Sequence, residues 1–92
     1  MKILIVEDEV GIANFLQQGL EEEGYTVLVA NDGKTGLELA LSQKVNIILL
    51  DWILPKMTGI EVCKSIRKTD TTTPIIFLTA KDTVQETIEG LK

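Results

Sequence analysis

Acidic side chains follow directly after two of the most apolar stretches of this sequence. Glu7 and Asp8 come after the aliphatic run 3–6, and Asp51 comes after the aliphatic run 47–50. Carboxylates that lie close together repel, so they raise one another's pKa or bind a cation. Mg²⁺ prefers oxygen ligands, takes few of them from the protein and keeps several waters. It therefore suits a cluster of two or three carboxylates better than Ca²⁺ does.

The elements that must bring these acids together are indicated by the hydrophobic pattern. The continuous apolar runs 3–6, 47–50 and 75–78 contain β-branched residues, which is typical of strands covered on both faces in a parallel sheet. The run 25–30 is more mixed and predicts a strand nearer an edge. Apolar residues at helical spacing predict amphipathic helices between and after these strands. Their predicted buried stripes are Ile12, Phe15, Leu16 and Leu20; Leu37, Ala40 and Leu41; Val62, Cys63 and Ile66; and Val84, Ile88 and Leu91.

Short-range signals mark where the helices begin and end. Thr58 lies three residues before Glu61, which fits a capping box in which each side chain binds the other residue's backbone N–H. Asp32 followed by Gly33 predicts the start of the second helix, and Gly24 predicts the end of the first. Strand and helix therefore alternate four times, which implies right-handed crossovers and a parallel sheet with helices on both faces.

The carboxyl ends of the strands form the crevice where ligands bind in an open α/β sheet. Glu7, Asp8 and Asp51 stand at such ends, and so does Thr79, which follows the run 75–78. If the first and third strands are neighbours, about 4.8 Å apart, up to three carboxylates share one pocket. Taken singly, each acid could be a solvated strand end. Together with the hydroxyl, the three acids predict a Mg²⁺ site.

Length and composition narrow the classes of function. The 92 residues suit one small domain, and a net charge of -5 without a basic run argues against direct nucleic-acid binding. The sequence has neither a signal-peptide core nor a run of about 18 apolar residues, which predicts a cytosolic protein that does not enter a membrane. Histidine is absent and Cys63 is the only cysteine, so an ordinary zinc site and an internal disulfide are excluded. The glycines match neither a dinucleotide-binding motif nor a P-loop.

Two side chains near these motifs have structural interpretations. Trp52 follows Asp51, so strand alternation points it away from the carboxylate, and we expect a packing or rim role. Cys63 lies on a predicted helix, where it is expected to be a small buried hydrophobic residue and not a reactive thiol.

Three segments resemble one known family. The stretches IVEDE (5–9), LLDWILPKMTGIEVCKSIR (49–67) and PIIFLTAK (74–81) are similar to the receiver domain of bacterial two-component response regulators. The similarity is greatest to the branch of winged-helix transcription factors. It covers the whole chain, so we expect one receiver domain over residues 1–92. The resemblance implies a flavodoxin-like, doubly wound α/β fold with a parallel sheet in the strand order 2-1-3-4.

The resemblance also implies a role for each site residue. Asp51 would accept a phosphoryl group from a sensor histidine kinase, and Thr79 would be the switch hydroxyl that turns to hold the phosphate. Asp8, Asp51 and the backbone carbonyl of Ile53 would bind Mg²⁺, while Glu7 would hold a coordinated water. The cation would neutralise and align two negatively charged partners. Such a domain is a phosphoacceptor and not an enzyme, beyond its own phosphorylation and dephosphorylation.

The family's pattern continues beyond these residues. Its members have a fifth strand, a lysine that contacts the phosphate and a fifth helix, so we expect an incomplete receiver domain. Lys56 and Lys81 lie at the rim of the site and could partly substitute for that lysine, although a solvated surface position is the expected role of each. Without a fifth strand the run 75–78 becomes an edge, which favours self-association with another copy.

Two other interpretations remain open. The chain could be a dissected or engineered flavodoxin-like fragment that self-associates and has no independent signalling activity. A phosphatase with an aspartate nucleophile is less consistent with the sequence, because the second aspartate that such enzymes carry two positions later is replaced by Ile53.

Overall fold

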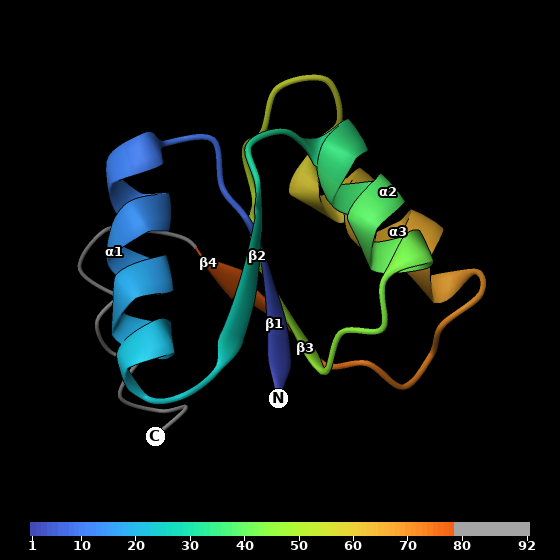
Figure 1. Cartoon of the computed structure of the whole chain (residues 1–92). Helices are drawn as coiled ribbons and strands as arrows, with labels where there is room; N and C mark the ends of the chain where they lie inside the picture. The colour runs from blue at the N-terminus through green and yellow to red at the C-terminus, as the bar shows by residue number, and fades with distance from the viewer. Residues whose placement is uncertain (79–92) are drawn as a thin grey trace.

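The computed structural model describes residues 1–78 of the 92-residue chain. Strands and helices alternate through this part of the chain, as the sequence predicts (Figure 1). In chain order the elements are β1 (Lys2–Val6), α1 (Val10–Glu22), β2 (Thr26–Ala30), α2 (Gly33–Ser42), β3 (Ile47–Asp51), α3 (Gly59–Arg67) and β4 (Ile75–Leu78). The fourth predicted helix, with Val84, Ile88 and Leu91, lies outside the described residues.

The strands of the described sheet are all parallel. Their order is β2-β1-β3-β4, so the predicted order 2-1-3-4 is confirmed. Helix α1 covers one face of the sheet, and α2 and α3 cover the other (Figure 1). The flavodoxin-like, doubly wound α/β fold is therefore confirmed for residues 1–78. The mixed run forms β2, which lies at one edge of the described sheet, as predicted.

Two cores, one on each face of the sheet, explain the continuous apolar runs. The core on the face of α1 contains Ile3, Ile5, Leu16, Leu20, Val27, Leu49 and Leu78. The core on the face of α2 and α3 contains Leu4, Val6, Ala30, Ile48, Leu50, Leu54, Val62 and Ile66. Successive residues of β1 and β3 alternate between these cores, because side chains alternate along a strand. A strand between two helix layers must therefore be apolar at every position.

The predicted burial of two residues is wrong. Phe15 is 51% exposed and Leu41 is 55% exposed. The buried stripe of α1 passes through Leu16, and Phe15 stands about 100° around the helix from it. In α2 the buried positions are Gly33 and Gly36 at its start, so the close contact of this helix lies away from Leu41.

The predicted helix ends are confirmed. Thr58 Oγ1 accepts a hydrogen bond from Glu61 N at 3.2 Å, and Glu61 Oε1 accepts one from Thr58 N at 3.2 Å, which completes the capping box of α3. Asp32 Oδ1 accepts a hydrogen bond from Thr35 N at 2.7 Å at the start of α2. Gly24 follows α1 with a φ of 91°, a conformation that glycine adopts without steric cost.

The sequence predicts no membrane-spanning helix and a buried Cys63. Within residues 1–78, none of the helices combines the length and the hydrophobicity that a membrane span requires. Cys63 on α3 has a free thiol and is half-buried beside the core of α2 and α3, so it packs as a small apolar side chain, less completely buried than expected.

Candidate functional site

Glu7, Asp8 and Asp51 lie together at the carboxyl edge of the sheet. Asp51 is the last residue of β3, and Glu7 and Asp8 directly follow β1. These strands are neighbours, with Val6 opposite Leu50. One carboxylate oxygen from each acid lies within 4.8 Å of the others. The strand order therefore brings together the three acids that the sequence singles out, and they are called the acidic cluster below.

The three carboxylates differ in burial. Glu7 is buried, with 3% of its surface exposed, Asp51 is half-buried and Asp8 is exposed. Asp51 Oδ1 accepts a hydrogen bond from the backbone N–H of Trp52 at 2.8 Å. Glu7 Oε2 accepts one from the backbone N–H of Glu9 at 3.0 Å. The cluster therefore has a buried side at Glu7 and an accessible side at Asp8 and Asp51.

Burial raises the pKa of Glu7 from 4.5 to about 7. The negative charge of Asp51 and hydrogen bonds shared with Asp51 and Asp8 also raise this pKa, while the hydrogen bond from the Glu9 N–H lowers it. Near neutral pH the metal-free protein therefore holds a proton at Glu7 for part of the time. A cation in the cluster would favour the ionised form instead, because it neutralises the charge that surrounds Glu7.

The loop between β3 and α3 closes tightly on the end of β3. Gly59 N donates a hydrogen bond to Trp52 O at 3.0 Å. A Cβ on Gly59 would lie 2.1 Å from Asp51 O, so the close approach requires glycine at this position. Ile53, whose carbonyl the resemblance assigns to the metal, lies in this loop with 83% of its surface exposed.

The other predicted residues near the site are Thr79, Lys81 and Trp52. Thr79 lies outside the described residues, as does Lys81; the residue before Thr79, Leu78, is the register partner of Asp51. Trp52 is 44% exposed, and its ring centroid lies 5.3 Å from that of Phe77 with the ring planes tilted by 58°. Trp52 therefore packs at the rim, as the sequence predicts.

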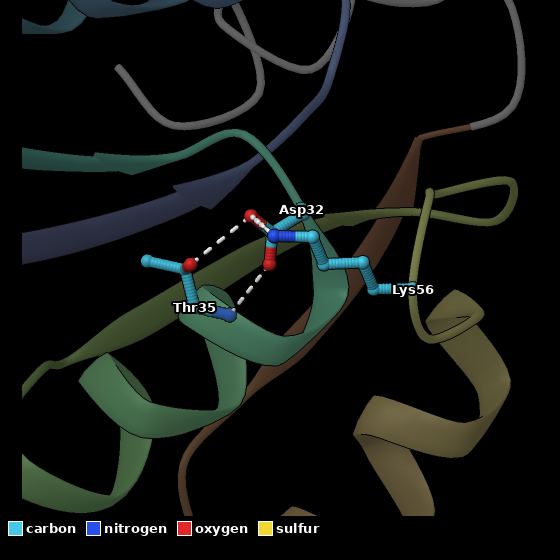
Figure 2. A network of polar contacts seen from close by, with 3 residues as sticks. All are labelled: Asp32, Thr35 and Lys56. Atoms are coloured by element: carbon cyan, nitrogen blue, oxygen red, sulfur yellow. Dashed lines mark hydrogen bonds and ion pairs between the residues drawn. The ribbon is translucent and has the colours of Figure 1, made fainter.

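Sequence reasoning missed a contact between two loops at this edge. Lys56 Nζ lies 3.7 Å from Asp32 Oδ2 (Figure 2). The Lys56 side chain is 65% exposed, so the expected surface position is correct, but the partner was not predicted. Gly33 N also donates a hydrogen bond to Pro55 O at 3.2 Å. The pair Asp32 and Gly33 predicts a helix start, and nothing in it indicates a contact with the loop after Asp51.

Comparison with known proteins identifies the family. Residues 3–92 match the model of the response regulator receiver domain. Response regulator ArlR from Staphylococcus saprophyticus is 50% identical over 90 residues, which are 98% of this chain and 40% of that protein. The alkaline phosphatase synthesis transcriptional regulatory protein PhoP from Bacillus subtilis is 46% identical over 91 residues, which are 99% of this chain and 38% of that protein. The chain thus spans about 40% of the length of these curated relatives.

Solved structures show the same fold. The receiver domain of sensor histidine kinase PA1611 from Pseudomonas aeruginosa, with a magnesium ion coordinated in its active-site cleft, has a TM-score of 0.83 and 33% identity and covers 87% of this chain and 67% of that chain. Response regulator TrrA from Thermotoga maritima, in complex with Mg²⁺ and BeF, has a TM-score of 0.82 and 32% identity and covers 97% of this chain and 78% of that chain.

This chain belongs to the response regulator receiver domain family. The resemblance described from the sequence is therefore confirmed. The names of the relatives, as response regulators and a transcriptional regulatory protein, agree with the transcription-factor branch to which the sequence is most similar.

Proposed function

We propose that this chain is the phosphoacceptor domain of a two-component signalling system and takes a phosphoryl group from a sensor histidine kinase onto Asp51 with Mg²⁺. The acidic cluster carries this proposal: one carboxylate oxygen from each of its acids lies within 4.8 Å of the others, with Glu7 at the buried side and Asp51 at an accessible side. Membership of the receiver domain family supports a signalling role.

The donor set of the cluster fits Mg²⁺. Asp8, Asp51 and the carbonyl of Ile53 would bind the ion, and Glu7 would hold one of its waters. The repulsion that helps to raise the pKa of Glu7 to about 7 is the kind that a divalent cation relieves. The similar receiver domains of PA1611 and TrrA were solved with the ion. When bound, Mg²⁺ supplies the positive charge that neutralises and aligns the carboxylate and the phosphoryl donor.

Asp51 is the nucleophile in this proposal. One of its oxygens accepts the hydrogen bond from the Trp52 N–H, which orients the carboxylate. An Asp51 oxygen forms the new P–O bond as the P–N bond to the donor histidine breaks. The Thr79 hydroxyl would then turn to hold the phosphate. Because Asp51 itself carries the product, the domain is an acceptor and not an enzyme with turnover.

Incubation with an acyl phosphate and Mg²⁺ tests the acceptor assignment. We expect intact-mass measurement to show one added phosphate that hydroxylamine removes, and none when Mg²⁺ is replaced by a chelator. Asp51→Asn is the matched variant, because it keeps the shape of the side chain and loses the charge. An Asp51→Asn protein that still gains the phosphate would rule out Asp51 as the acceptor.

Titration with Mg²⁺ tests the metal site separately. Trp52 is the only tryptophan and directly follows Asp51, so its fluorescence reports on the cluster. We expect a saturable change in the folded wild-type chain and none in Asp51→Asn. A folded wild-type chain whose fluorescence does not respond would contradict the metal site.

We also propose that copies of this chain associate through β4. This strand is the last in the order of the described sheet, and its Ile75, Ile76 and Phe77 are only half-buried. An apolar edge of this kind favours pairing with another chain. Sedimentation should show dimers that increase with protein concentration, and a compact monomer at high concentration would contradict the proposal. Association without phosphate acceptance would instead favour the structural-fragment interpretation.

We propose further that this segment does not bind nucleic acid directly and that it works in the cytosol. The net charge of -5 supports the proposal that this segment does not bind nucleic acid directly. We place the domain in the cytosol, and its relatives among bacterial response regulators support this location. A filter-binding assay with duplex DNA at low salt should detect no complex.

A further inference from the structure

We propose that the start of α2 is a positioning element for the site: Gly33, aided by the cap residue Asp32, holds the turn Pro55–Met57 and thereby fixes the loop that contains Ile53. This inference rests on the proposed function, because it assigns a part in Mg²⁺ binding to residues outside the acidic cluster. The start of α2 lies at the same edge of the sheet as that cluster (Figure 1).

The turn Pro55–Met57 has a backbone conformation that depends on its surroundings. Met57 N donates a hydrogen bond to Pro55 O at 2.8 Å, which closes a three-residue turn. Lys56 at the centre of this turn has a φ of 70° and is the one non-glycine residue with a positive φ among residues 1–78. A side chain makes this conformation unfavourable, so it persists only where neighbouring contacts hold it.

The start of α2 supplies such contacts. The first backbone N–H groups of a helix have no partner within the helix, and Gly33 N uses this capacity to donate to Pro55 O at 3.2 Å. Asp32 caps the helix by accepting from Thr35 N at 2.7 Å, and its other oxygen lies 3.7 Å from Lys56 Nζ (Figure 2). One aspartate therefore orders the helix start and also pairs with the strained turn.

The space between α2 and the loop also requires glycine. A Cβ on Gly33 would lie 2.0 Å from Met57 O and 2.8 Å from Met57 Cβ, so a larger residue must push the turn away. At the other end of the loop, Gly59 approaches the backbone of Asp51 just as closely. The loop is therefore held at two places, by α2 at Gly33 and by the end of β3 at Gly59.

Ile53 depends on this support. Ile53 is 83% exposed and contributes little packing, so the position of its carbonyl is determined by the residues on either side. Residues that orient a metal ligand without binding the metal typically change metal affinity about 10- to 100-fold when they are replaced. Replacement of Gly33 should therefore weaken Mg²⁺ binding although Gly33 itself is not a ligand.

Gly33→Ala in the full chain tests this inference through two measurements. The dissociation constant for Mg²⁺, measured by Trp52 fluorescence, should rise about 10-fold or more. In the metal-free protein, the amide NMR signals of Trp52, Ile53 and Gly59 should shift. The second measurement does not depend on metal binding, so it reports on the loop even if the proposed metal site is wrong.

Two control variants separate positioning from a general loss of stability. Gly11→Ala introduces the same methyl group into α1, where nothing lies within 4 Å of the new Cβ. Ile3→Val removes a buried methyl group at the start of β1, the opposite end of the strand from Glu7, and reduces stability without touching the loop. Both controls should keep the wild-type dissociation constant within about twofold and leave the three amide signals in place.

A second pair of variants keeps the inference testable if Gly33→Ala does not fold. Asp32→Ala removes the cap and loosens the first turn of α2, so it should weaken Mg²⁺ binding about threefold or more and shift the same amide signals. Asp32→Asn keeps the oxygen that accepts from Thr35 N, and it loses the ion pair with Lys56 and the acceptor of the Thr35 hydroxyl. Both lost contacts lie at the surface, so this variant should bind Mg²⁺ nearly as well as wild type. Equal binding by Asp32→Ala, Asp32→Asn and wild type would contradict the inference.

The outcomes distinguish this inference from the proposed function. If wild type binds Mg²⁺ and Gly33→Ala binds it equally well with unchanged amide signals, the positioning role is wrong and the proposed function stands. If wild type binds no Mg²⁺, the proposed function fails, and the amide signals alone decide the inference: shifts confined to Gly33→Ala and Asp32→Ala support it, and unchanged signals overturn it.

Discussion

Protonation of Glu7 makes the stability of the metal-free protein depend on pH. The pKa of Glu7 is about 7 in the folded protein, where burial raises it, and 4.5 without that environment. A carboxyl with a raised folded pKa contributes stability that is fully present below its unfolded pKa, and this contribution is lost as pH rises through the folded pKa. The free energy of unfolding should therefore fall as pH rises from about 5 to about 8.

The size of this effect follows from the two pKa values. One pKa unit corresponds to about 1.36 kcal/mol, so the change from 4.5 to about 7 is on the order of 3 kcal/mol. Two of the groups that raise this pKa are open to solvent, since Asp51 is half-buried and Asp8 is exposed, so the figure is an upper value that solvent screening reduces. Between pH 5.5 and 8, where ordinary carboxylates stay ionised, roughly 2 kcal/mol of it should be lost.

Urea unfolding with a chelator, at pH 5.5 and at pH 8, measures this loss. Glu7→Gln is the matched variant, because glutamine has nearly the same shape and does not titrate. Its unfolding free energy should change less between the two pH values than that of wild type, by roughly 2 kcal/mol. If the proposed Mg²⁺ site exists, saturating Mg²⁺ should also remove the loss in wild type, since the ion would bind the folded form with Glu7 ionised. The same pH dependence in wild type and Glu7→Gln would refute the reasoning.

Other substitutions give further expectations. Thr58→Ala removes the capping box of α3, so the unfolding free energy measured by urea denaturation should fall by about 1 kcal/mol. Thr58→Ser keeps a capping hydroxyl and should retain most of the wild-type stability. Gly59→Ala places a Cβ 2.1 Å from Asp51 O, so stability should fall by about 1–3 kcal/mol and phosphate acceptance should fall with it; normal acceptance would contradict the tight closure. The pKa of Asp70 is lowered from 3.8 to about 2 by hydrogen bonds, of which the one from the Thr73 hydroxyl has the largest effect. Their stabilisation is present above pH 3.8 and is lost as pH falls through about 2, so acid unfolding curves of wild type and Asp70→Asn should converge over that interval.

The features that depend on neighbours in the sequence could be predicted. The aliphatic runs of β1 and β3 indicate strands because a strand between two helix layers is apolar on both faces. The cap pairs also act within a few residues, so Thr58 with Glu61 identifies the start of α3. The meeting of Glu7 with Asp51 could be predicted as well, since it needs only the order of two neighbouring strands.

The contacts between loops could not be predicted in this way. Gly33 begins α2 after β2, and Pro55 lies in the loop after β3. A glycine at a helix start indicates a cap or a turn and does not identify a distant partner. The exposure of Phe15 has a related cause. Helical spacing shows which residues share a stripe, but the side that the neighbouring core covers decides where the stripe ends.

The burial of Glu7 connects the core of the domain to its chemistry. The backbone of Glu7 is held on the side of β2, because its N–H donates to Ala30 O at 2.9 Å and its carbonyl accepts from Asn31 Nδ2 at 3.1 Å. Asp51 is held by its place at the end of β3. Neither strand end can move away without losing core contacts, so the repulsion between the two carboxylates is relieved by a proton or by a cation. If the cluster binds Mg²⁺ as proposed, the packing that stabilises the sheet also makes protons and Mg²⁺ compete there. Phosphate acceptance at limiting Mg²⁺ should then increase as pH rises through about 7.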